Sequence, residues 1–170
     1  MFNLFITRIF RAIKIDIELY EEVEKDKKAT VQAGIVVVLS SLAAGVGALQ
    51  MGMSNFLLAP VMSLLSWYVW AYVIYFVGVK LLGDRKTKSS HGELLRTIGF
   101  SSAPGLIRVF GIIPSLTSVV FITTSIWMLV AMVIAVRQAL DYKSTWRAIG
   151  VVVTAFLLQS IILVMILKLF

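Results

Sequence analysis

The residues of this chain that carry chemistry are few, and most lie in one aromatic run. The segment SWYVWAYVIYF contains Trp67, Tyr68, Trp70, Tyr72 and Tyr75. The three tyrosines follow helical spacing and share one face, and each hydroxyl needs a hydrogen-bond partner in apolar surroundings. This pattern favours contacts across a helix interface. The alternative is that these residues line a groove for a lipid or a pigment.

Arg108 is the only charged residue between Arg96 and Arg137. A charged side chain in such an apolar stretch is costly, so it points to a function. One interpretation is an arginine near a helix end that extends to the membrane interface beside Pro114. The other is capture of a lipid phosphate or of a partner's carboxylate.

The residue pattern of an enzyme or of a metal site is missing. His91 is the only histidine, the chain has no cysteine, and the phosphate-binding pattern GxxxxGK[ST] does not occur. We expect His91 to be a solvated loop residue. The stretches 27–83 and 94–140 contain no Asp or Glu, which a proton-coupled carrier would need inside the membrane. We therefore predict no catalytic residue and no metal, and we expect bound lipid in place of a cofactor.

The composition indicates the solvent environment of the chain. Hydrophobic residues make up 59% of its 170 residues and charged residues 15%, whereas roughly a quarter of the residues of soluble domains are charged. A chain of this size cannot cover that much apolar surface in water. Its formal charge of +7 comes from residues between the apolar runs, which is typical of membrane loops and argues against a nucleic-acid partner.

The apolar runs predict an all-α, polytopic transmembrane bundle. The uncharged stretch 29–79 holds two crossings of about 20 residues each, with a turn near 52–55. We predict five spans, and they lie at about 29–50, 57–80, 94–113, 116–137 and 146–168. The third contains Pro104 and Gly105, so a half-helix that enters and leaves on one side is the alternative there.

The basic residues orient this bundle. With five crossings, the N-terminus and the loops 80–96 and 137–147 share one side, which holds 14 of the 16 Lys and Arg. Because basic loops remain cytoplasmic, the N-terminus should lie inside and the C-terminus outside.

Residues 1–28 predict a separate amphipathic element. On one helix, an apolar stripe would comprise Phe2, Ile6, Ile9, Ile13, Ile17 and Tyr20. The charged residues Arg8, Arg11, Lys14, Glu18, Glu22 and Lys25 would occupy the opposite side. Such a helix lies in the membrane interface with its basic side chains toward the headgroups. The alternative is a helix that packs on the protein's own cytoplasmic face.

Several degenerate patterns together resemble the Yip1 domain family, here in a small prokaryotic form. They are YEEVEKDKKATVQA (20–33), ELLRTIGFSSAPGLI (93–107) with Phe100, Ala103 and Pro104, then Pro114, Trp127 and VRQALDYKSTWRAIG (136–150). The resemblance implies a domain over 29–170 with five spans, in a prokaryotic inner membrane. Eukaryotic members act with small GTPases of the Rab class through a longer N-terminal region and a DLYGP-type motif, which this chain lacks, so that role is not carried over.

Three functions are compatible with these features. The first is a non-enzymatic protein that organises membrane lipids, other membrane proteins or copies of itself. The second is an accessory subunit of a larger membrane complex. The third is a translocator of lipids or small solutes, which requires a polar cavity within the bundle.

Overall fold

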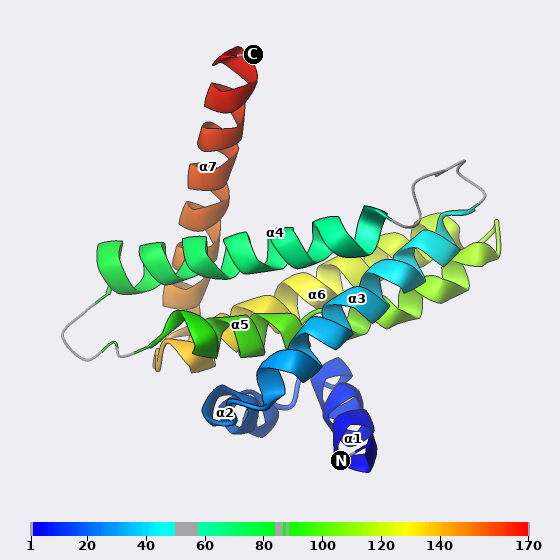
Figure 1. Ribbon diagram of the computed structural model, residues 1–170, viewed down its shortest axis with the longest axis horizontal. Coiled ribbons are helices and arrows are strands. Elements are labelled where there is room, and N and C mark those ends of the chain that lie inside the picture. The colour runs from blue at the N-terminus through cyan, green and yellow to red at the C-terminus, as the bar shows by residue number, and fades with distance from the viewer. Residues whose placement is uncertain (1, 50–57, 84–86, 88, 170) are drawn as a thin grey trace.

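The residues that the structure describes form nine helical segments and no strand (Figure 1). The computed structural model describes residues 2–49, 58–83, 87 and 89–169, so the turn expected near 52–55 lies outside them. The α-helices α1 to α7 comprise Phe2–Ile13, Ile17–Lys25, Ala29–Gly47, Leu58–Tyr75, His91–Phe100, Thr117–Ala139 and Thr145–Leu169. The π-helix η2 comprises Phe76–Leu81, and the 3-10 helix η3 comprises Ala103–Ile112.

Within the part of the chain that the structure describes, four stretches of helix are long and apolar enough to cross a membrane. They are Ala29–Gly47, Leu58–Leu81, Thr117–Ala139 and Thr145–Ile162. The all-α polytopic class is thus confirmed, but the prediction of five spanning helices is one too many. The expected third span, 94–113, forms two short helices, α5 and η3, in place of one long helix. Pro104 lies at the start of η3, and proline lacks the N–H that a continuing α-helix would need there.

The two short helices nevertheless run along α3, because glycines let the backbones come close. Glycines recur every six residues in this segment, and small residues of α3 recur every seven. The contacting pairs are Gly99 with Ala33, Gly105 with Ser40 and Gly111 with Gly47. Six residues of 3-10 helix advance by about 12 Å and seven of α-helix by about 10.5 Å. The two repeats therefore stay in register along the bundle.

The three segments rich in Lys and Arg meet at one end of the bundle, which we call the basic end. Arg96 of α5 donates from Nε to the carbonyl oxygen of Val23 in α2 at 2.9 Å. Gln138 of α6 donates to a carboxylate oxygen of Glu21, also in α2, at 3.0 Å. The loops expected to share one side of the membrane thus share one end of the fold. The opposite end, where α3 and η3 finish, is called the distal end.

Residues 1–28 contain two helices, and the expectation of one continuous amphipathic helix was wrong. The chain turns between α1 and α2 at Ile15, whose φ of 56° lies in the left-handed region. Asp16 then caps α2, because its side chain accepts a hydrogen bond of 3.0 Å from the backbone N–H of Glu18. This turn folds α1 back toward η3 and α2.

The packing of α1 also differs from the expected one. Arg8, expected on the outer polar face, is buried and donates to the carboxylates of Glu22 and Asp26. Leu4 and Phe10 of the same helix are exposed. Helix α1 therefore packs on the protein's own basic end, which was the alternative to a helix lying in the membrane interface. Contact of its exposed apolar face with the membrane interface stays a prediction.

Tyr20 provides a test of this N-terminal packing. Its hydroxyl is buried without a hydrogen-bond partner among the described residues, and such a group costs about 1–3 kcal/mol. We expect Tyr20→Phe to raise the free energy of unfolding by about 1 kcal/mol, measured as a higher melting temperature in detergent. The control is Tyr142→Phe, which removes a 2.7 Å bond to the carbonyl of Gly78 and should lower it. A lower melting temperature for Tyr20→Phe would contradict the packing.

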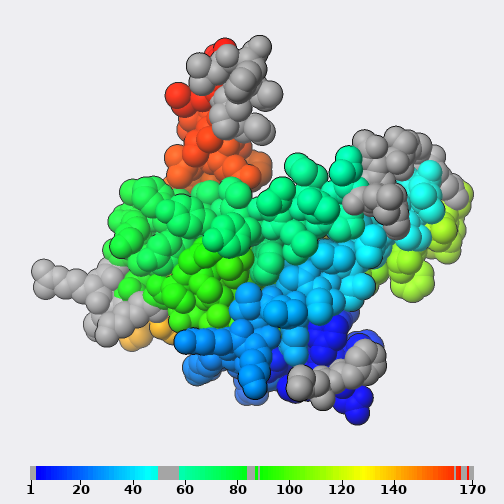
Figure 2. Space-filling model, viewed as in Figure 1, coloured from blue at the N-terminus to red at the C-terminus, as the bar shows by residue number. Residues whose placement is uncertain are grey.

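Helix α7 stands out from the rest of the bundle, as the ribbon and the space-filling view show (Figure 1, Figure 2). Its first half packs on the other helices, where Ala148, Val151 and Ala155 are fully buried. Farther along, Phe156 and Met165 are among its exposed apolar side chains. The second half of α7 therefore offers its surface to lipid or to another protein.

Candidate functional site

A cavity of about 480 Å³ lies between α3, α4, α6 and the segment formed by α5 and η3. Among the described residues, seven serines from these elements line it: Ser40, Ser41, Ser63, Ser66, Ser101, Ser102 and Ser125. Arg108 of η3 is the one charged residue among the described residues of the lining. The rest of the wall is apolar and comprises Val37, Trp67, Trp70, Ile98, Met128, Leu129 and Met132. We call this space the serine cavity.

The serine hydroxyls differ in their hydrogen bonds. Ser41, Ser63 and Ser101 each donate to the carbonyl oxygen three residues earlier, at 2.7–2.9 Å. These bonds satisfy the donors while leaving oxygen lone pairs free to accept. The hydroxyls of Ser40 and Ser102 form no hydrogen bond with the described residues. The cavity therefore presents both donors and acceptors to a polar ligand.

Arg108 points into the cavity from η3. Its Nε donates to Thr124 Oγ1 at 3.2 Å and its Nη2 to Ser125 Oγ at 2.9 Å, both on α6. The guanidinium carbon lies 5.4 Å from the ring centroid of Phe121. Ser125 follows the first residue of α6 by eight positions, which places it about 12 Å from the distal end. The side chain thus extends toward the interior, whereas an arginine that snorkels would extend toward the helix end.

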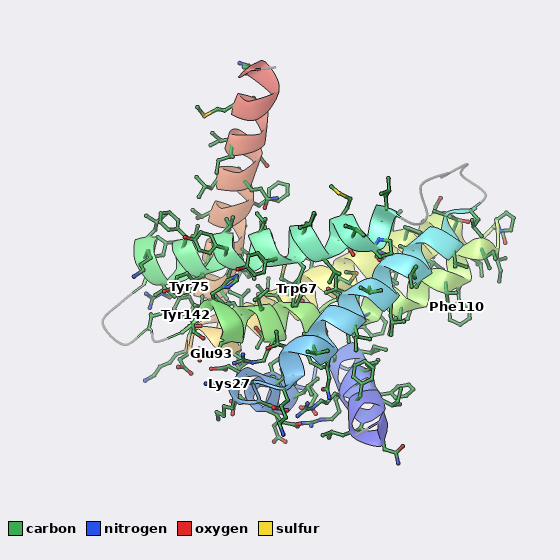
Figure 3. All side chains as sticks on the ribbon, in the orientation of Figure 1. Lys27, Trp67, Tyr75, Glu93, Phe110 and Tyr142 are labelled. Atoms are coloured by element: carbon green, nitrogen blue, oxygen red, sulfur yellow. The ribbon has the colours of Figure 1, made fainter. Side chains whose placement is uncertain are left out.

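The two tryptophans of the aromatic run form the apolar wall of the cavity. The indole N–H of Trp67 donates to the carbonyl of Leu95 at 3.0 Å, and Trp67 lies between α4 and α5 (Figure 3). The indole N–H of Trp70 contacts the sulfur of Met132 at 3.1 Å. Because both N–H groups have partners, the rings present apolar surface to the cavity.

The tyrosines of the same run do not line the serine cavity. Tyr68 and Tyr72 are 57% and 56% exposed, and Tyr75 is half-buried against other apolar residues. His91 packs edge-on against two of them, with ring centroids 4.8 Å from Tyr68 and 5.7 Å from Tyr72. The expectation that His91 is a solvated loop residue was wrong, since it begins α5 and is half-buried. The structure thus separates the tryptophans from the tyrosines of one run.

The sequence pattern predicted a role for Arg108, Trp67 and Trp70 but not for the serines. A signal was present, because Ser40–Ser41, Ser63 with Ser66, and Ser101–Ser102 are close pairs inside apolar segments. Serine is a common residue at packed helix interfaces in membranes, so each pair alone indicates only packing. Their function as a set depends on four elements coming together.

A comparison with known families bears on this architecture. The family model of the Yip1 domain matches residues 19–167 of the 170. The chain belongs to the Yip1 domain family. No curated protein and no solved structure matches it. The Yip1 domain here begins within α2, so it covers every element that lines the serine cavity and leaves α1 outside.

Membership and the four apolar helices make this Yip1 domain protein an integral, multi-pass membrane protein. The motif residues Phe100, Ala103 and Pro104 are all buried where α5 meets η3. They therefore mark the break in the third segment. This break brings Ser101 and Ser102 into the cavity wall.

Proposed function

We propose that this Yip1 domain protein is a non-enzymatic membrane protein that binds a lipid in the serine cavity and thereby organises its membrane or its partners. The observation that carries the proposal is the lateral opening of the cavity. Ser66 of α4 and Ser125 and Leu129 of α6 belong to its lining and are exposed. In a bilayer these positions face lipid, so a lipid enters from the side without crossing water.

The chemistry of the walls supports a lipid over a wholly polar or wholly apolar ligand. Hydroxyls and one guanidinium suit a headgroup, while Trp67, Trp70 and Met132 suit the start of an acyl chain. The volume of about 480 Å³ falls within the range of roughly 300–1,000 Å³ that is typical of small-molecule sites. The cavity thus accepts part of a lipid whose tails remain in the bilayer.

The arrangement in the membrane is also part of the proposal. The basic end faces the cytoplasm of a prokaryotic inner membrane, because it gathers the Lys- and Arg-rich segments. The exposed half of α7 contacts other membrane proteins or a second copy. The mass of the complex purified in mild detergent separates a free-standing protein from an accessory subunit, which would bring fixed partners with it.

The test fills the mouth of the cavity. Ser66→Phe places a ring at the opening between α4 and α6, and we expect it to lower the lipid retained through purification by about tenfold, the effect of losing about 1.4 kcal/mol. Retained lipid is measured by native mass spectrometry. Val69→Phe is the matched control, because Val69 is an exposed residue of α4 outside the cavity lining. Equal retention by the two variants would contradict lipid binding in the cavity.

The same cavity favours one second candidate, a translocator of lipids or small solutes. Such a protein needs polar groups inside the bundle, and the serines with Arg108 supply them. Reconstitution into liposomes distinguishes the two functions. A translocator moves labelled lipid between leaflets, and Ser66→Phe slows it, whereas an organiser binds lipid without such movement.

A further inference from the structure

The Arg108 guanidinium carries a charge that the described part of the chain does not balance. Every ion pair among the described residues belongs to Arg8 or Arg11 at the basic end. The stretch 94–140 around Arg108 contains no Asp or Glu. Holding a cation inside an apolar bundle without a counter-charge costs free energy. An anion from outside the chain would therefore lower its energy.

The geometry leaves room for such an anion. Arg108 uses Nε and Nη2 to reach the neutral hydroxyls of Thr124 and Ser125. A guanidinium has five N–H donors, so three of them form no bond with the described residues. These donors belong to a side chain that lines the serine cavity, beside hydroxyls that can also donate. Planar guanidinium groups bind phosphate oxygens in pairs, which makes phosphate the anion of best fit.

We propose that Arg108 binds the phosphate of a membrane phospholipid whose headgroup enters the distal half of the serine cavity. This inference rests on the proposed lipid-binding function and deepens it. A lipid phosphate fits better than a free one, since the lateral opening faces the bilayer and tryptophan and methionine side chains line the wall beside the hydroxyls. Thr124 and Ser125 position the guanidinium on α6.

The depth of the site identifies the leaflet. The hydroxyls that hold Arg108 lie about 12 Å from the distal end of α6 and farther from its basic end, since α6 has 23 residues. The bound headgroup therefore comes from the leaflet at the distal end, opposite the one next to α2. It is drawn below the normal headgroup level, toward the interior of the bundle.

The experiment compares two lipids with the same acyl chains on the purified full-length protein. Phosphatidylglycerol and diacylglycerol are titrated into the delipidated protein, and the bound fractions are measured by native mass spectrometry. We expect the wild type to prefer phosphatidylglycerol by about tenfold or more, the effect of hydrogen bonds to a charged group. Arg108→Gln should lose this preference while still binding diacylglycerol, and Arg108→Lys should retain part of it.

Three controls keep the test decisive. Lys168→Gln removes the only other cation outside the basic segments and should keep the wild-type preference. Ser125→Ala removes one partner of Arg108 without removing its charge, so it should weaken the preference even if Arg108→Gln fails to fold. Inorganic phosphate and glycerophosphate, added at equal concentration without lipid, should not raise the melting temperature.

The outcomes separate the inference from the function on which it rests. Equal binding of both lipids by the wild type, or an unchanged preference in a folded Arg108→Gln protein, overturns the phosphate contact and leaves lipid binding in place. Stabilisation by free phosphate alone overturns the lipid source. Binding of neither lipid overturns the proposed function as well.

Discussion

Gly47→Ala is expected to lower the free energy of unfolding by about 3 kcal/mol, because the bundle has no room for the added methyl group. Gly47 is buried at the end of α3, where a Cβ would overlap the backbone carbonyl oxygen of Arg108 and lie 3.1 Å from the ring of Phe121. A backbone oxygen cannot rotate away as a flexible side chain can. Helix η3 would have to move and take Arg108 with it, so the retained lipid should fall together with stability.

Thermal or chemical denaturation in detergent, followed by circular dichroism, measures this effect. Gly34→Ala is the matched control in the same helix, since its Cβ would meet Trp67 at an ordinary 3.5 Å. Gly150→Ala in α7 is a second control, since its Cβ would meet no described atom within 4 Å. Both should be neutral or stabilising by up to about 1 kcal/mol, because alanine favours helix more than glycine does. If Gly47→Ala unfolds like Gly34→Ala, α3 and η3 do not approach as described.

Arg8→Met is expected to cost about 2–3 kcal/mol, because it leaves two carboxylates without the cation that they share. The Arg8 side chain is 5% exposed and bonds to Glu22 at 2.8 Å and to Asp26 at 2.8 Å. A third bond, of 2.7 Å, joins it to Gln32 of α3. The residue therefore connects α1, α2 and α3. Its loss should release α1, which limited proteolysis of the N-terminus would detect.

Arg11→Met is the control for this variant. Arg11 bonds to Asp16 and Glu22, but its side chain is 29% exposed, and ion pairs near the surface contribute about 1 kcal/mol or less. Its variant should therefore unfold closer to the wild type. Equal losses in the two variants would contradict the special position of Arg8.

The pH dependence of the free energy of unfolding tests the contact between Arg8 and Asp26 independently. The hydrogen bond from Arg8 holds the pKa of Asp26 below its ordinary value. A carboxyl group with a lowered pKa in the folded state stabilises that state above its unfolded pKa, about 3.9, and the contribution is lost as the pH falls through the folded pKa. The wild type should thus lose stability below about pH 5. Arg8→Met should lose less over the same range.

The sequence predicted well those features that depend on local composition. Uncharged stretches of sufficient length identify spanning helices, since each helix satisfies its own backbone hydrogen bonds in lipid. The spans at 29–50, 57–80, 116–137 and 146–168 agree closely with the four apolar helices. The grouping of the basic segments at one end was predictable for a similar reason. In a chain that crosses a membrane repeatedly, the order of the crossings decides at which end each loop and its charges lie.

The sequence predicted the structure less well where the conformation of a segment depends on which neighbouring element it packs against. Arg8 follows helical periodicity onto the polar face of α1, and only the turn at Ile15 brings Glu22 and Asp26 over it. The segment 94–113 has the composition of a span. Its division into α5 and η3 depends on Pro104 and on the match between its glycines and the small residues of α3.

The sequence by itself determined that this protein is an α-helical membrane protein with a basic end, because hydropathy and charge act residue by residue. Only the tertiary structure decided where its candidate site lies. Ser40 of α3, Ser66 of α4, Ser125 of α6 and Ser102, between α5 and η3, are far apart in the chain. They form one lining because the close packing of α3 on η3 fixes which face each helix presents to its neighbours. No local pattern carries that information, since a hydroxyl on a single helix can face lipid, a neighbour or a cavity.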